Sequence, residues 1–335
     1  MSPRRGAALL AAGAVLAACG GDPSALDPAG RGAREIAVLW WIMLGLGTAV
    51  FALVLVVLWR SRRRAPAGDR SSAPLTADDA SERAGHRWML LGGVLLPVVV
   101  VLPLSLLTLV IGDRLWSRGG EDVLHVELVG HQFWWEVRYP DTGAVTANEI
   151  HIPVDREVRI SMTSEDVIHS FWVPNLHGKV DLIPGEDTHI VIDADEPGRY
   201  EGLCAEFCGI QHAHMKLLVV AHDAEEFEAW SEREAAEAGT PSTSAERDGA
   251  EAFATLGCAS CHTVRGTSAV GDVGPDLTHI ASRLTLGANT IPNNRGNLGG
   301  WIADPQRIKP GNRMPPTVLD AEQHRALVAY LESLE

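Results

Sequence analysis

Residues 204–215 read CAEFCGIQHAHM, and the earlier stretch DVIHSFWVP contains a further histidine, His169. Two cysteines four residues apart, followed by a histidine and a methionine, supply the soft and intermediate ligands that copper prefers over hard cations. One alternative is a disulfide between the two cysteines of an exported chain, and another is a tetrahedral zinc site. Only a copper site also gives a role to His212 and Met215. The candidate copper ligands are His169, Cys204, Cys208, His212 and Met215.

The residues around this stretch predict short β-strands. Between Val123 and about His222, segments such as EVRISMTS and MKLLVVAH alternate in polarity, and Pro and Gly separate them. This pattern is typical of an all-β sandwich or barrel. A loop at the end of such a sandwich can wrap a metal ion, while His169 comes from another strand. His214 lies two residues from His212 and is expected to point to the opposite side, as a structural or exposed residue.

Before the strands, residues 36–59 and 88–112 form two apolar segments without a charged residue. Each exceeds the roughly 20 residues that cross the hydrocarbon core of a bilayer. A run of arginines, residues 60–64, follows the first segment, and the positive-inside rule assigns the loop after it to the cytoplasm. The sequence therefore predicts a two-helix transmembrane hairpin in residues 32–115, with everything after Asp113 outside the cell membrane of a bacterium.

The first residues predict an export signal. Residues 1–18 contain two arginines and then an apolar stretch that is too short to span a bilayer. The run LAACG ending at Gly20 resembles a bacterial lipobox, so Cys19 is expected to carry a lipid that anchors the chain to the bilayer. The alternative is an ordinary signal or an uncleaved anchor that happens to contain a cysteine.

Three motifs give the strand region a family resemblance. HSFWVP at 169–174, KVDLIPG at 179–185 and the cysteine stretch, together with two preceding helices, resemble subunit II of cytochrome c oxidase over about residues 32–222. The resemblance implies a cupredoxin-like domain over 121–222 with a dinuclear copper A centre. It further implies that Cys204 and Cys208 bridge two copper ions.

The same resemblance assigns the remaining ligands. His169 and His212 would bind one copper ion each, and Met215 would be a weaker ligand. The backbone carbonyl of Glu206 would be the other weak ligand, and the Glu206 carboxylate would reach a magnesium ion shared with subunit I. The candidates for the point where electrons enter are Phe133, Trp134 and Trp135. The family commonly has tryptophan where this chain has Phe133, and the alternative is that these aromatic residues form a stripe of the core.

A linker at 223–245 leads to a second exported region. Its segment AEEFEAWSEREAAEAG could form a helix, and the rest is expected to be a flexible connection that keeps two redox centres at high effective concentration. CASCH at 258–262 then matches the attachment motif of c-type heme, with thioethers at Cys258 and Cys261 and His262 as an axial ligand. A zinc half-site and a redox dithiol are the alternatives.

Residues 246–335 resemble a small monoheme cytochrome c, an all-α domain. The resemblance rests on the heme motif, on GPDL at 274–277, and on an aromatic residue in each terminal helix, the second helix being expected at 320–334. Met314 is the only methionine after the heme motif and is the expected second axial ligand, since a Met/His pair raises the iron potential. His279 and His324 are the competing candidates.

The two resemblances together imply subunit II of a caa3-type cytochrome c oxidase. The chain would accept electrons from a cytochrome c donor through heme c and copper A and pass them to subunit I, where oxygen reduction is coupled to proton translocation; subunit III is a further expected partner. The net charge of −15 speaks against nucleic acid as a partner. A quinol oxidase subunit would lack the copper ligands, and nitrous oxide reductase would lack the membrane helices. A membrane-tethered electron shuttle outside any oxidase is the alternative function.

Overall fold

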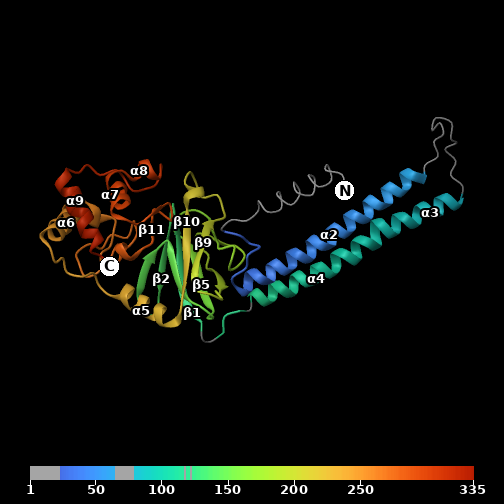
Figure 1. Ribbon diagram of the computed structural model, residues 1–335, viewed down its shortest axis with the longest axis horizontal. Helices are drawn as coiled ribbons and strands as arrows, with labels where there is room; N and C mark the ends of the chain where they lie inside the picture. Colours follow the sequence, from blue (N-terminus) through green and yellow to red (C-terminus); the bar gives the residue numbers. More distant parts are fainter. Residues whose placement is uncertain (1–22, 65–78, 117, 121–122) are drawn as a thin grey trace, which may run out of the picture. The chain divides into compact units, whose positions relative to one another are not determined.

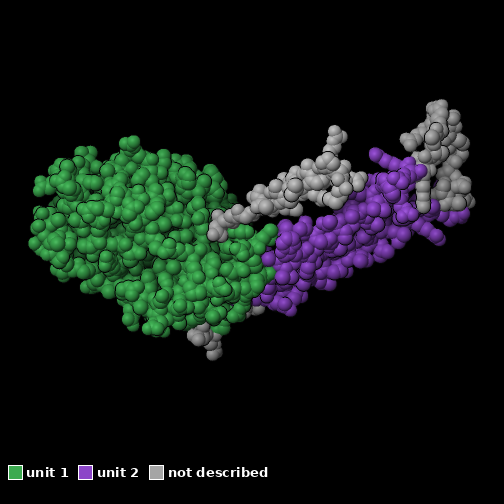
Figure 2. Space-filling view, viewed as in Figure 1, with its two compact units in different colours: residues 1–34, 119–335 green, residues 35–118 purple. Residues whose placement is uncertain are grey.

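The computed structural model describes residues 23–64, 79–116, 118–120 and 123–335. The expected signal peptide and Cys19 lie outside these residues. Two compact units are distinguished: residues 1–34 with 119–335, and residues 35–118 (Figure 2). Each unit is described separately below.

The predicted apolar segments form long helices. Helix α2 covers Arg31–Arg64, while α3 (Asp79–Leu90), the π-helical turn η1 (Leu91–Leu95) and α4 (Leu96–Trp116) form the second helical run. Residues 36–59 and 88–112 lie inside these two helical runs. Large apolar side chains point outward along both, and Leu109 is 69% exposed. Both are long and apolar enough to cross a membrane.

The strand region is a sandwich of two five-stranded sheets (Figure 1). The first has the order β3-β2-β1-β5-β8 and the second the order β4-β10-β9-β6-β7. The strands of the first sheet are β1 (Leu124–His131), β2 (Trp134–Tyr139), β3 (Ala144–Ala147), β5 (Val158–Ser164) and β8 (Thr188–Ile192). Those of the second are β4 (Glu149–Pro153), β6 (His169–Trp172), β7 (Val180–Leu182), β9 (Gly198–Cys204) and β10 (Lys216–His222).

Alternating side chains fill the space between the two sheets. In β5, Val158, Ile160 and Met162 are almost completely buried, as the polarity pattern of this strand predicts. The core continues through Trp135 and Phe171, one from each sheet. Strands β1 and β5 are parallel, as are β4 and β10, so the sandwich is mixed rather than a simple meander.

Helix α5 (Ala224–Ala235) forms where the linker sequence predicts a helix. It is not part of a free tether, because it packs on strands β3, β4 and β10. Phe227 and Trp230 belong to the core of the sandwich, and both rings lie near the ring of Tyr139. Residues 123–235 are called the β-sandwich domain below.

The C-terminal part, residues 244–335, is called the helical domain. Its helices are α6 (Ser244–Thr255), α7 (Arg295–Ala303), α8 (Pro305–Ile308) and α9 (Ala321–Glu332). Short turns η3 (Cys258–Ser260) and η4 (Ile280–Ser282) and the small pair β11 (Thr285–Leu286) and β12 (Ile291–Pro292) connect them. Helices α6 and α9 pack together, and the rings of Phe253 and Tyr330 meet edge to face at 5.8 Å. The expected fold class is thereby confirmed.

Candidate metal centre and heme pocket

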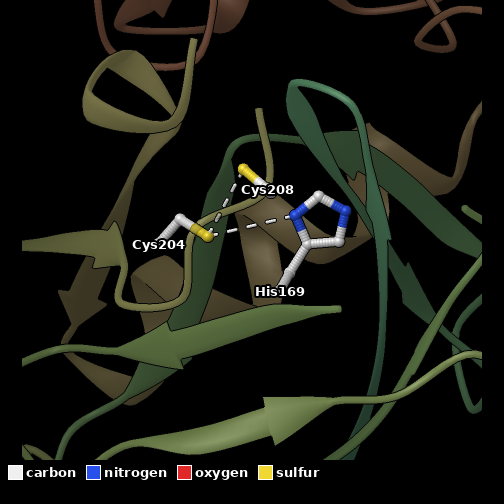
Figure 3. A group of neighbouring side chains, drawn as sticks. All are labelled: His169, Cys204 and Cys208. Atoms are coloured by element: carbon white, nitrogen blue, oxygen red, sulfur yellow. Dashed lines mark hydrogen bonds between the residues drawn. The ribbon is translucent and has the colours of Figure 1, made fainter. Parts of the chain in front are cut away.

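The candidate copper ligands come from two strands and one loop. His169 begins β6, Cys204 ends the neighbouring strand β9, and their side chains point toward each other (Figure 3). The chain then turns through Cys208 and the short turn η2 (His212–His214) before β10 begins after Met215. Phe171 pairs with Cys204 across the two strands, which fixes the distance between the histidine and the loop.

The donor atoms converge in two groups around the two sulfur atoms. Cys204 Sγ lies 3.9 Å from Nδ1 of His169 and 3.2 Å from the carbonyl oxygen of Glu206. Cys208 Sγ lies 3.8 Å from Nδ1 of His212 and 3.7 Å from Sδ of Met215. The two sulfur atoms are 3.8 Å apart, and both cysteines are free and buried. The structure thus brings together all six donors that the sequence singled out.

The electrostatics of this group favour bound cations. The Cys208 thiol and the nearby His169 lower the pKa of Cys204. The hydrogen bond to Cys204, burial and the negative charge of Cys204 raise the pKa of Cys208, because a second thiolate beside the first is unfavourable. Metal cations between the two sulfur atoms would compensate both negative charges, so the donor set fits a pair of copper ions.

Asp166 orients the imidazole of His169. Its Oδ1 lies 2.8 Å from Nε2 of His169, whose ring is fully buried, so Nδ1 faces the sulfur of Cys204. Burial alone would lower the pKa of His169, but hydrogen bonds with Cys204 and Asp166 raise it. The sequence reasoning missed Asp166, although a carboxylate three residues before a candidate ligand is a usable signal.

Two further polar residues of the loop, Glu206 and His214, lie at the surface. His214 is exposed, and its Nδ1 is 2.9 Å from Oε1 of Gln211, in keeping with the expectation that it is not a ligand. Glu206 is also exposed, although its backbone carbonyl faces Cys204.

A large apolar pocket lies in the helical domain, with about 1330 Å³ of empty space that includes solvent at its mouth. All four expected heme-binding residues line it: Cys258, Cys261, His262 and Met314. Arg283 lines the pocket as well, and its buried Nε has no hydrogen-bond partner among the described residues. Another nitrogen of the guanidinium donates to the carbonyl oxygen of Asp276, so one N–H remains unpaired beside the apolar cavity. This arrangement suits a flat apolar cofactor with acidic substituents, so the pocket fits a heme.

The orientation of His262 also suits an axial ligand. Its Nδ1 donates to the carbonyl oxygen of Pro275 at 2.8 Å, which leaves Nε2 as the free nitrogen. Burial lowers the pKa of His262, so the neutral ring is favoured. A side chain at Gly274 would meet the imidazole at 2.6 Å, which explains why glycine fits here.

Met314 enters the pocket from a loop that hydrogen bonds hold in place. Its amide donates to Oδ1 of Asn312, and its carbonyl accepts from Gln306, both at 2.8 Å. The competing histidines do not line this pocket. Both ring nitrogens of His279 face carbonyl oxygens, and Nε2 of His324 lies 2.8 Å from the carbonyl oxygen of Gly299.

The three aromatic residues of the 133–135 stretch separate into two locations. Phe133 and Trp134 line the heme pocket, although they belong to the β-sandwich domain. Trp134 also stacks on His131 with ring centroids 4.4 Å apart. Trp135 points into the sandwich core, is fully buried and lies 5.8 Å from the ring of His169. Trp135 is therefore part of the sandwich core, whereas Phe133 and Trp134 are part of the pocket wall.

The pocket is thus built by both domains. Gln132 and Asn148 of the sandwich also line it, and so does Lys309 of the helical domain. Lys309 was not singled out from the sequence, because a lysine in a loop rich in proline and glycine is ordinarily exposed.

Comparisons with known proteins agree with this architecture. The family described as "Cytochrome C oxidase subunit II, periplasmic domain" matches residues 144–222, and the family described as "Cytochrome c" matches residues 246–335. Cytochrome c oxidase subunit 2 of Alkalihalophilus pseudofirmus is 35% identical over 96% of this chain and 94% of that protein. The protein of the same name from Bacillus sp. (strain PS3) is 30% identical over 96% and 94%.

Among solved structures, the periplasmic domain of subunit II of cytochrome oxidase (CoxB) of Bradyrhizobium japonicum is 29% identical and covers 34% of this chain and 95% of that chain, with a TM-score of 0.33. The two bacterial relatives match along nearly their whole length, through both the strand region and the heme motif. The chain therefore belongs to the cytochrome c oxidase subunit II family, in the form that carries a cytochrome c domain after the β-sandwich.

Proposed function

We propose that this chain takes electrons from a cytochrome c donor through a covalent heme c and a dinuclear copper A centre and delivers them to subunit I of an oxidase of the caa3 type. The convergence of four further donor groups on two buried sulfur atoms is the observation that carries this proposal. When bound, the copper ions and the heme iron supply the one-electron redox chemistry.

In this proposal Cys204 and Cys208 would hold both copper ions. The carbonyl of Glu206 and the imidazole of His169 lie on the side of Cys204, whereas His212 and Met215 lie on the side of Cys208. The strand pairing and the bond from Asp166 hold the ligands before metal binds, so little rearrangement of the protein accompanies a change in oxidation state.

The helical domain supplies the heme ligands in the same proposal. Cys258 and Cys261 would hold the heme through thioether bonds, and His262 and Met314 would bind its iron. The hydrogen bond from His262 to Pro275 keeps Nε2 directed away from the protein backbone, and the Asn312 and Gln306 contacts hold Met314 in place.

Phe133 is the residue proposed to connect the two sites. Its side chain lines the heme pocket, and its ring lies close to Gly209, which follows Cys208 in the chain. Trp134 lies at the same wall of the pocket, whereas Trp135 supports His169 from the sandwich core.

Further parts of the proposal concern the surroundings of the chain. The exposed carboxylate of Glu206 is free to reach a magnesium ion shared with subunit I. Helices α2 and α4 would anchor the chain as a hairpin, with both redox domains on the outer face of the cell membrane and a lipid on Cys19. Subunit III and coupling to proton translocation complete the proposed assembly.

The test compares two neighbouring histidines in the full-length chain. We expect two copper ions, a mixed-valence EPR signal and one covalent heme in the wild type and in His214→Asn, and loss of the EPR signal in His212→Asn. A disulfide between Cys204 and Cys208 after metal loading would contradict the copper assignment. Co-purification with a large multi-helix subunit separates an oxidase from a membrane-tethered electron shuttle.

A further inference from the structure

The segment just before Met314 lies against the β-sandwich domain. Residues 309–313, called the docking segment below, follow helix α8 and belong to the helical domain. Their contacts, however, reach the loops around residues 132, 166, 210 and 214 of the sandwich. The segment therefore connects the candidate axial ligand of the heme with the loops that hold the candidate copper ligands.

Lys309 makes the central contact of this segment. Its Nζ donates to the carbonyl oxygens of Phe133 at 2.9 Å, His214 at 2.8 Å and Gly287 at 2.9 Å. Two of these acceptors belong to the sandwich and one to the helical domain. The residue is only 2% exposed. A buried lysine is costly unless all its protons are bonded, and here three carbonyl oxygens match the three protons of the ammonium group.

Burial lowers the pKa of Lys309 to about 7. The three carbonyl oxygens can accept all three protons only from the charged amine. The hydrogen bonds therefore favour the ammonium form at this position.

Other residues of the docking segment reinforce this contact. The carbonyl oxygen of Pro310 accepts a hydrogen bond of 2.5 Å from Gln211. Arg313 donates to Oε1 of Gln132 at 2.6 Å and lies 3.4 Å from a carboxylate oxygen of Asp166. Each of these partners lies on the sandwich side of the junction.

The sandwich residues that the segment touches are neighbours of the candidate copper ligands. Gln132 donates to the carbonyl oxygen of Cys208 at 2.6 Å. Gln211 precedes His212, and Asp166 holds His169. Residues 204–215 are called the copper loop below. The docking segment contacts this loop directly at Gln211 and His214, and it reaches Cys208 through Gln132.

We propose that Lys309 is a positioning residue that locks the helical domain onto the β-sandwich domain and fixes the heme pocket against the copper loop. In this arrangement the cytochrome domain stays docked during turnover and does not swing on its linker. The docking itself stands without the proposed function, whereas its effect on electron transfer rests on that function.

The first test measures hydrogen–deuterium exchange in the purified full-length chain with its partner subunits. Three amides report on docking because they donate across the junction: Lys216 to the Ala288 carbonyl, and Leu284 and Thr285 to the Glu149 carboxylate. In Lys309→Met we expect these amides to exchange about tenfold faster or more, since three buried carbonyls lose a charged donor.

The matched control is Arg307→Met. Arg307 carries the same charge two residues away but is exposed in helix α8, so its removal should leave the exchange unchanged. Unchanged exchange in Lys309→Met, or an equal increase in both variants, overturns the proposal.

A second variant covers the case in which Lys309→Met does not accumulate. Arg313 is 60% exposed in its side chain and joins the same segment to Gln132 and Asp166, so Arg313→Gln is expected to fold. The proposal requires faster exchange of the same three amides in this variant, and wild-type exchange would overturn it.

The second readout separates positioning from simple stability. After rapid reduction of the heme, the rate of electron transfer to copper should fall at least about tenfold in Lys309→Met, while the heme absorption spectrum stays that of the wild type. A wild-type rate combined with faster exchange overturns the positioning role. If the wild type holds no copper, the proposed function fails, but the exchange measurement still decides the docking.

Discussion

At the residue scale, the two candidate metal sites orient their histidines in the same way. One ring nitrogen of His169 faces a carboxylate oxygen of Asp166, and one of His262 donates to the carbonyl oxygen of Pro275. In both rings the opposite nitrogen is then directed toward the site. Such hydrogen bonds select the tautomer and raise the basicity of the ligand.

Replacement of Asp166 tests this orientation. In Asp166→Asn we expect copper affinity to fall by about 10 to 100-fold, because the anionic partner of His169 is lost while all candidate ligands remain. The measurement is a competition titration with a copper chelator, followed by EPR. Glu165→Gln, an exposed neighbouring change of the same kind, should keep wild-type affinity. Equal affinity in both variants would mean that the Asp166 bond does not support the site.

The sequence predicted the donor groups of both sites better than their supporting residues. The cysteines, histidines and methionines stand out because few other roles explain their spacing. Lys309 and Asn148 carry no such signal, because their importance depends on contacts between residues far apart in the chain. Phe133 and Trp134 were identified as candidates, but only the packing of the two domains reveals that they line the heme pocket.

At the element scale, helices α6 and α9 approach closely because Gly249 has no side chain. A Cβ atom there would lie 2.1 Å from the carbonyl oxygen of Ala326 and 2.6 Å from Cβ of Tyr330. Backbone and packed Cβ atoms cannot move aside cheaply, so the two helices would have to separate.

Gly249→Ala is therefore expected to destabilise the helical domain. Alanine gains about 1 kcal/mol of helix propensity over glycine, but forcing an extra carbon into a packed site costs about 1 to 3 kcal/mol or more. We expect the clash to win and the melting temperature, followed by heme absorption, to fall by several degrees. Gly239→Ala is the control, since nothing lies within 4 Å of a Cβ at that position. A melting temperature at or above that of the control would refute the close approach.

The start of α6 should respond to acid. Glu246 accepts hydrogen bonds from the amides of Ser242 and Thr243, and these bonds lower its pKa to about 2. A lowered folded-state pKa means that the stabilisation is present above the ordinary value of 4.5 and is lost as the pH falls toward about 2.

The measurement for this cap is amide exchange at Ser242 and Thr243 in the full-length chain. Protection relative to Glu246→Gln should be constant above pH 4.5 and should disappear as the pH falls toward about 2. Glu251→Gln, an exposed change in the same helix, should follow the wild type at every pH. If the ratio of protection in the wild type to protection in Glu246→Gln did not change with pH, the Glu246 carboxylate would not stabilise the start of α6. The cap would then depend on the Thr243 side chain alone.

The linker illustrates what periodicity can and cannot predict. The composition of residues 224–239 indicated a helix, and α5 covers Ala224–Ala235 within this segment. The sequence did not indicate that Phe227 and Trp230 are buried in the sandwich core, because this burial depends on the space that β4 and β10 leave for the two rings. The linker therefore begins with a helix that belongs to the folded β-sandwich domain.

At the scale of the β-sandwich and helical domains together, two arrangements could bring the two proposed redox sites close to each other. One is a flexible tether, and the other is a fixed contact between the domains. A flexible tether sets an effective concentration that falls as the linker lengthens, whereas a locked interface is insensitive to linker length. The contacts of Glu149, Lys309 and Arg313 support the second description.

Lengthening the linker distinguishes the two descriptions. We expect that inserting ten Gly/Ser residues after Gly239, which has open space around it, leaves the rate of electron transfer between the heme and copper unchanged. The rate is measured after rapid reduction of the heme in the intact oxidase, with a substitution of Gly239 by Ser as the control. A rate that decreases with insert length would favour a diffusing domain.

The shared wall of the heme pocket also limits how the two domains can be exchanged between relatives. Phe133, Trp134 and Asn148 of the β-sandwich domain complete the pocket. A cytochrome domain grafted from another protein would therefore lack the residues that complete its own pocket. Lys309 donates to the carbonyl oxygens of Phe133, His214 and Gly287 at the contact between the two domains. A change at Lys309 or Gly287 in the helical domain therefore alters the hydrogen bonds that the carbonyls of Phe133 and His214 in the β-sandwich domain can form. A graft of one domain is therefore expected to need matching changes in the other.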